Sequence, residues 1–206
     1  MEPTVILSNE HRVIELVLTC LERIAGKAKS DGKLDTESAV QALDFFRTFA
    51  DGCHHGKEED HLFPAMVNKG VPQQGGPIAV MLSDHEQGRA HIRAMTEHVE
   101  AAGAGEAAAI DEFARQAHGY IAMLRGHIQK EDQVLFPLAD RIMGSDDEQK
   151  LMAAYHSVEH DHMGEGTHER YLKIAETLAD RYDVPKDALA QAHESTSCGC
   201  GHAKKD

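Results

Sequence analysis

The sequence predicts an all-α protein: an up-down-up-down antiparallel four-helix bundle followed by a C-terminal helical extension. Apolar residues recur with a 3.6-residue period through almost all of the 206-residue chain, and no stretch alternates convincingly as a strand. Four long periodic segments are joined by short loops rich in Gly and Pro, which favours consecutive helices packed side by side in opposite directions. A motif of the second segment returns in the fourth, so the bundle is predicted to be a helix pair used twice.

The bundle is expected to occupy residues 1–144. Its first helix should begin after Ser8, a favourable N-cap residue. Gly70 suits the C-cap of the second helix, and Pro77 suits the first turn of the third. The four helices are expected at about residues 9–28, 36–69, 77–102 and 106–143.

Residues 145–183 are expected to form a helical extension that packs on or caps the bundle, with helices at about 146–163 and 167–182. Ser145 and Glu148 make a capping box at its start. Residues 184–206 lose the helical period and are expected to form a disordered tail. Cys198 and Cys200 near its end either capture a soft metal ion or are incidental thiols.

Composition excludes several classes of partner. The formal net charge of −14 opposes binding to nucleic acid or to an anionic membrane surface. No apolar run approaches the roughly 18 residues of a membrane span, and the N-terminus lacks the features of a signal peptide. A cytoplasmic protein is therefore expected. Its fifteen histidines point towards metal binding.

One eleven-residue motif occurs twice, at residues 54–64 and 127–137. The copies share His, Lys, Glu, Leu, Phe and Pro in the same order. Glu58 follows His54 by four residues, and Glu131 follows His127 in the same way. This spacing puts both side chains of a pair on one face of a helix. Imidazole nitrogen and carboxylate oxygen side by side are typical metal ligands.

The repeat extends to the first and third helices. Each has an acid–His pair, Glu10-His11 and Asp84-His85, at nearly equal distances before the motif. Because the start of one helix lies beside the end of the next in an antiparallel pair, four histidines and two glutamates should meet at one level of the core. Two buried carboxylates without a cation would carry a large desolvation cost. The pattern therefore predicts a metal site rather than isolated core histidines and surface pairs.

The order His, His-x-x-x-Glu, His, His-x-x-x-Glu, with Leu-Phe-Pro after each doublet, resembles the hemerythrin-like cation-binding family over about residues 5–143. The resemblance implies a four-helix bundle with a non-haem di-iron centre, in which an oxo or hydroxo bridge joins two iron ions. Mixed nitrogen and oxygen ligands suit iron but also allow manganese or zinc. By position, the resemblance implies that both glutamates bridge the ions and that the metal ligands are His11, His54, Glu58, His85, His127 and Glu131.

The register at His54 has a competitor. His55 and Glu59 show the same spacing one residue later. The repeat favours His54, because position 55 aligns with Ile128 in the second copy. His55 is therefore expected near the site as a secondary candidate.

Two positions differ from the oxygen-carrying hemerythrins. Those carriers place their carboxylate five residues after the last His, where this chain has Asp132, although the repeat favours Glu131. They also have a further His four residues after the ligand on the third helix, where this chain has Arg89. For two six-coordinate ions, the predicted ligands and the bridge leave two open positions, against one in the carriers. Two open positions favour redox turnover of peroxide or nitric oxide.

The extension offers two more secondary candidates. Residues 156–168 are rich in histidine and acidic residues. A loop at residues 164–168 that folds over the open end of the bundle would offer Glu165 or His168 to the metal. The alternative is a solvated polar helix.

The predicted function is to bind or react with O₂, peroxide or nitric oxide in an oxygen, redox or nitrosative-stress response. Such a protein is a reversible O₂ carrier or sensor, or an enzyme such as a di-iron peroxidase or a nitric oxide-consuming oxidoreductase with an unknown electron donor. A third alternative is an iron donor, similar to the family's proteins that repair iron–sulfur clusters. Those usually have a cysteine-containing N-terminal domain that these 206 residues do not contain.

Overall fold

A computed structural model describes residues 2–158, 166–187 and 189, and every regular element among them is helical. None of the described helices has the length and apolar character needed to cross a membrane. Three of the segments are π-helical and are labelled η. The elements are α1 (Pro3–Asp31), α2 (Thr36–Phe45), η1 (Phe46–His55), η2 (Glu58–Leu62), α3 (Phe63–Asn68), α4 (Pro77–Gly103), α5 (Ala107–Lys130), η3 (Glu131–Leu135), α6 (Phe136–Ile142), α7 (Ser145–Ser157) and α8 (Thr167–Arg181).

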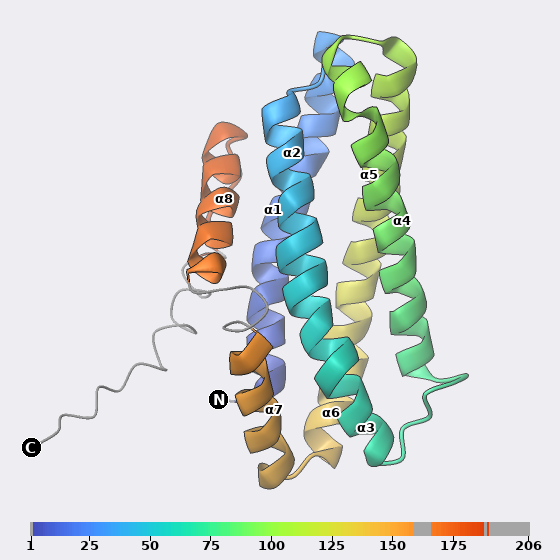
Figure 1. Ribbon diagram of the computed structural model, residues 1–206, viewed down its shortest axis with the longest axis vertical. Helices are drawn as coiled ribbons and strands as arrows, with labels where there is room; N and C mark the ends of the chain where they lie inside the picture. The colour runs from blue at the N-terminus through green and yellow to red at the C-terminus, as the bar shows by residue number, and fades with distance from the viewer. Residues whose placement is uncertain (1, 159–165, 188, 190–206) are drawn as a thin grey trace, which may run out of the picture.

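Four long helical rods lie side by side along the molecule (Figure 1). The second rod runs without a break from α2 through η1 and η2 to α3, and the fourth runs from α5 through η3 to α6. The loops from α1 to α2 and from α4 to α5 lie at one end of the molecule, and the loop from α3 to α4 lies at the other. The start of each odd rod therefore lies level with the end of the even rod that follows it.

Helix α1 begins at Pro3, earlier than the start after Ser8 that the sequence predicts. Pro3 occupies its first turn, where the missing N–H and the fixed φ of proline favour a helix. Leu7 is fully buried, so the additional turn gains apolar contacts. The Ser8 hydroxyl donates a hydrogen bond to the Asp132 carboxylate at 3.0 Å instead of capping the helix.

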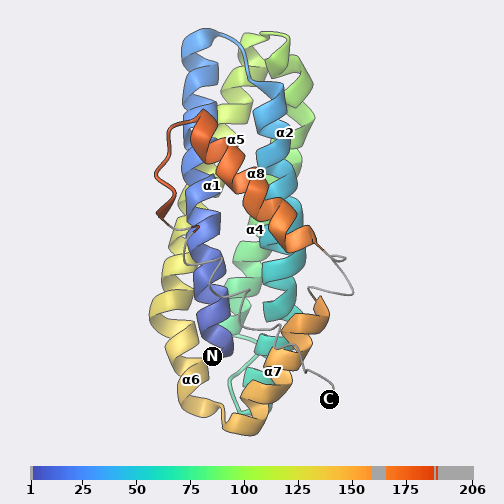
Figure 2. The same cartoon turned by 90° about the vertical axis from the view of Figure 1, so that its left-hand side faces the viewer.

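The extension covers two parts of the bundle. Helix α7 contacts α1 and η2 near the end where the chain begins, and α8 packs across α1 and α2 (Figure 2). The last residues predicted for the fifth helix lie outside the described part of the chain, as do Cys198 and Cys200. The predicted tail begins too early, because Val184 and Leu189 are buried against the core.

The apolar core is split into two clusters along the bundle. The lower cluster lies at the end of the bundle where the chain begins, and on α1 it includes Leu7. The upper cluster lies towards the other end and includes Val13 and the later buried apolar residues of α1. The other three rods divide in the same way, at residues 51–61, 82–91 and 129–134. Among the described residues, the buried histidines and buried charged side chains gather at this level, whereas the buried hydroxyl residues Thr4 and Ser38 lie elsewhere.

Candidate metal centre

Seven buried side chains meet at the level between the two apolar clusters, and none of these residues is more than 4% exposed. They form two overlapping groups, and the potential donor atoms of each group lie within 4.8 Å of one another. Glu58 belongs to both groups. The first comprises His11, His54, Glu58 and Glu131, and the second comprises His55, Glu58, His85 and His127.

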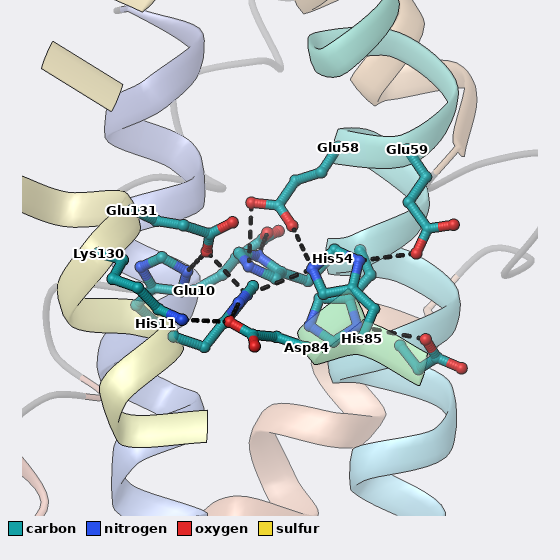
Figure 3. A network of polar contacts seen from close by, with 12 residues as sticks. Glu10, His11, His54, Glu58, Glu59, Asp84, His85, Lys130 and Glu131 are labelled. Atoms are coloured by element: carbon teal, nitrogen blue, oxygen red, sulfur yellow. Dashed lines mark hydrogen bonds and ion pairs between the residues drawn. The ribbon is translucent and has the colours of Figure 1, made fainter. Parts of the chain in front are cut away.

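The two carboxylates lie between the groups. One oxygen of Glu131 is 3.2 Å from Nε2 of His11 and 3.1 Å from Nε2 of His127. The oxygens of Glu58 lie 3.6 Å from Nε2 of His54 and 3.5 Å from Nε2 of His85. Figure 3 shows both carboxylates reaching towards the imidazoles from different helices. Each glutamate is therefore placed to bridge one ion in each group.

The inner atoms of the centre have unmet bonding capacity. Among the described residues, both oxygens of Glu58 and of Glu131 are buried without a hydrogen bond, as is Nε2 of His11, His54 and His55. Their close contacts do not have hydrogen-bonding geometry. Buried polar atoms without partners are costly, and a carboxylate costs most. A pair of cations with mixed nitrogen and oxygen ligands would satisfy all of these atoms, so the residues fit the metal pair that the sequence predicts.

A carboxylate holds the outer nitrogen, Nδ1, of every imidazole. An Nδ1–H that donates to a carboxylate leaves Nε2 unprotonated and aimed at the centre, which is the usual support of a metal-binding histidine. The pairs are His11 with Asp132 at 2.9 Å, His54 with Glu10 at 2.9 Å, His55 with Asp51 at 3.2 Å, His85 with Glu59 at 2.7 Å and His127 with Asp84 at 3.4 Å.

Four of these five carboxylates were named from the sequence, but their support of the imidazoles was not predicted. Glu10 and Asp84 were noted as neighbours of His11 and His85, but each supports the histidine of the following rod. Glu59 and Asp132 occupy equivalent positions of the repeat, directly after Glu58 and Glu131. An acidic residue at this position in both copies of the repeat could have indicated a supporting role.

A cation neutralises each supporting carboxylate. The Lys57 ammonium, fully buried, lies 2.5 Å from Glu10, and Lys130 pairs with Asp84 at the equivalent position of the repeat. Arg12 pairs with Asp132, and Arg89 pairs with both Asp51 and Glu59. The centre is thus surrounded by a shell of ion pairs, which keeps the carboxylates ionised.

His55 joins the centre although the repeat ranked it behind His54. Consecutive residues of an α-helix point about 100° apart, but η1 is a π-helix, whose wider turn brings neighbouring side chains closer in direction. The His55 ring stacks on that of His85, with 3.8 Å between centroids and 13° between planes. At the aligned position the chain is α-helical, and Ile128 packs in the upper apolar cluster.

The Leu-Phe-Pro sequences set the geometry at both glutamates. Proline lacks an N–H and its ring collides with the carbonyl four residues earlier in an α-helix. Before each proline the chain forms a π-helical turn, in which the N–H of Phe63 donates to the carbonyl of Glu58 and that of Phe136 to Glu131. The two π-helical turns begin at Glu58 and Glu131. The structure accommodates each proline with this wider turn.

The electrostatics of the metal-free centre are asymmetric. Burial and the neighbouring carboxylate of Glu131 raise the pKa of Glu58 well above its usual 4.5. Burial also opposes the ionisation of Glu131, but the imidazoles of His127 and His11 outweigh it and hold that pKa well below 4.5. Burial lowers the pKa of His54 to about 4, which keeps this imidazole neutral. A cation entering the centre would therefore displace a proton from Glu58.

Only one of the two secondary candidates in the extension can be placed. Glu165 lies outside the described residues. His168 is at the start of α8, and its ring lies 5.5 Å from that of Phe49, outside both donor groups. The described residues therefore do not bring His168 to the donor atoms, and residues 164 and 165 of the predicted loop lie outside the described part of the chain.

The comparisons with known proteins agree with the geometry. The hemerythrin HHE cation-binding domain matches residues 2–139. Three uncharacterized proteins, one from Mycobacterium bovis and two from strains of Mycobacterium tuberculosis, are each 24% identical to this chain over 178 residues. The match covers 84% of this chain and 66% of each relative, so it spans just under two thirds of their length. No solved structure gives a significant match. The chain belongs to the hemerythrin HHE cation-binding family.

Proposed function

We propose that the chain holds two iron ions between its five histidines and two glutamates, and that it binds one small ligand there, such as O₂ or nitric oxide. The main support for this proposal is the set of inward-facing atoms without hydrogen bonds on both glutamates and on three of the five histidines, each of the five imidazoles being held at Nδ1 by a carboxylate. Iron supplies the reversible electron transfer that binding of such ligands requires.

His55 changes the count of ligands. Five imidazoles, two bridging carboxylates and a solvent-derived bridge would occupy all but one of the positions of two six-coordinate ions. Three of these imidazoles lie in one group and two in the other. A single, asymmetric open position suits reversible binding of one ligand better than the two positions expected from the sequence. His55 thereby takes the part of the histidine that Arg89 replaces.

Burial supports retention of the ions. The seven donor residues are at most 4% exposed and come from all four rods. Release of an ion would break its contacts with side chains of several rods. This arrangement favours a resident centre over the iron-donor alternative.

The test is anaerobic reconstitution of the full chain with ferrous iron, followed by metal analysis and optical spectra on addition of O₂, nitric oxide or peroxide. The expected result is two irons per chain and an adduct with O₂ or nitric oxide that is reversed when the gas is removed. Fewer than two irons would contradict the metal centre. Steady consumption of peroxide or nitric oxide with an added electron donor would instead identify an enzyme.

A further inference from the structure

A cavity of about 180 Å³ lies between η1, α4 and α5, beside the metal centre. We call it the arginine pocket. His55 and His85 line its buried end, whereas the exposed residues Arg47 and Arg93 line it at the surface. The cavity therefore connects solvent with two of the histidines that face the centre.

The mouth of the arginine pocket carries uncompensated positive charge. Arg47 donates a hydrogen bond to the neutral hydroxyl of Thr96 at 3.3 Å, and no carboxylate pairs with Arg47 or Arg93 within the described part of the chain. The acidic residue of the lining, Asp51, is already paired with Arg89. In a chain with a net charge of −14, two such arginines at one opening form a local site for an anion.

The walls of the pocket are apolar and aromatic. Phe46, Ile92 and Tyr120 line it between the mouth and the histidines. A dry cavity of about 150 Å³ is large enough for a benzene molecule, so this one accommodates an apolar body of similar size. An inorganic anion would use the two arginines but leave these walls without contacts.

We propose that the arginine pocket binds a small monocarboxylate with an apolar body. Its carboxylate pairs with Arg47 and Arg93, since guanidinium groups match carboxylate geometry. Its body lies between Phe46, Ile92 and Tyr120 and ends beside His55 and His85. The bound anion closes this approach to the centre, so its concentration controls access from this side. The inference stands on the pocket alone and does not depend on which metal the centre holds.

Benzoate is the probe, titrated calorimetrically into the full chain both iron-loaded and metal-free. The expected result is saturable binding of one benzoate in both forms, weakened about tenfold or more in the double variant Arg47→Gln/Arg93→Gln. Benzyl alcohol, the neutral analogue, should bind at least about tenfold more weakly than benzoate. Arg125→Gln is the control: it removes one positive charge from the α1–α5 face, where Arg125 pairs with Glu22, and should bind benzoate as the wild type does.

Several outcomes would overturn the proposal. One is equal affinity for benzoate in the wild type and the double variant, with both proteins showing the same helical circular dichroism. Another is equal affinity for benzoate and benzyl alcohol, which would show a merely apolar cavity. Benzoate binding that occurs only with iron would show direct coordination to the metal instead. Failure of the chain to bind iron would contradict the proposed function but not the pocket, because the metal-free titration is independent of iron.

Discussion

His55 shows how one side chain decides the character of the centre. Its Nε2 is buried without a hydrogen bond, its Nδ1 is held by Asp51, and its ring stacks on His85. Arg89 fixes Asp51 in turn. Arg89 therefore supports His55 through Asp51.

We expect His55→Ala to open a second ligand position without preventing the protein from folding. The variant should bind one of its two irons at least about tenfold more weakly, since even supporting residues of metal sites change affinity by about 10- to 100-fold. Metal analysis during dialysis against a chelator measures this loss. His118→Ala, which removes an exposed histidine of α5, is the control. Iron retention equal to the wild type would show that His55 is not a ligand.

Glu10 and Asp84 occupy equivalent positions but differ in the burial of their lysine partners. Lys57 is fully buried beside Glu10, whereas the side chain of Lys130 beside Asp84 is 44% exposed. Burial alone would raise the pKa of Glu10, but Lys57 and His54 outweigh it and hold the pKa at about 2.

We therefore expect Glu10→Gln to destabilise the metal-free protein by about 3 kcal/mol, because it removes one partner of a buried ion pair. Asp84→Asn should cost only about 1 kcal/mol, since water solvates Lys130. Urea unfolding of the two metal-free variants measures both values. An equal loss of unfolding free energy in the two variants would show that the burial of Lys57 does not strengthen its pairing with Glu10.

The π-helical turns are the feature of the elements that positions the glutamates. Elements η2 and η3 begin at Glu58 and Glu131, and each ends two residues before a proline. Proline removes one backbone hydrogen bond, and the wider turn before it makes room for its ring. The wider turn occurs at the same position in both copies of the repeat.

Pro64→Ala tests this link. Alanine restores the N–H and favours an α-helical turn, which rotates Glu58 relative to the imidazoles. The metal-free protein should unfold at the same or a higher temperature, while iron affinity falls about tenfold or more. Pro77→Ala, at the first turn of α4, is the control and should leave iron affinity unchanged. Unchanged iron affinity in Pro64→Ala would show that the π-helical turn does not position the ligand.

At the scale of the whole molecule, the centre joins the four rods at the level where the apolar core is interrupted. Ionised Glu58 opposes folding there when the metal is absent, since burial and Glu131 raise its pKa, and bound cations would link the rods through the inward-facing ligands. Metal binding would therefore be coupled to folding.

The coupling predicts a pH dependence. The folded, metal-free protein holds a proton on Glu58, whose pKa is raised above that of the unfolded chain, so its stability falls as pH rises above about 4.5. Metal displaces this proton and removes the loss. Iron loading should therefore raise the melting temperature more at pH 8 than at pH 6, as measured by circular dichroism. Metal-free Glu58→Gln should be more stable than the metal-free wild type at pH 8, and the opposite order would contradict this explanation.

The sequence by itself determined the helical class, the limits of the second, third and fourth rods to within a few residues and the meeting of six side chains. It could do so because the apolar period and the spacing of His and Glu are local properties, and the repeat of the motif reports which levels of the helices correspond. The repeat also favoured Glu131 over Asp132 for the inner position. In the structure Asp132 instead holds Nδ1 of His11 from outside.

Only the tertiary structure decided the position of His55, the supporting carboxylates and the arginine pocket. The π-helix η1 contains no proline that would have indicated it in the sequence. His54 and His55, its last two residues, both reach the centre. Glu10 and Asp84 support histidines of the neighbouring rods, which sequence spacing cannot specify. Because each of these features depends on which helices pack together and in what rotation, it arises only when the four rods assemble.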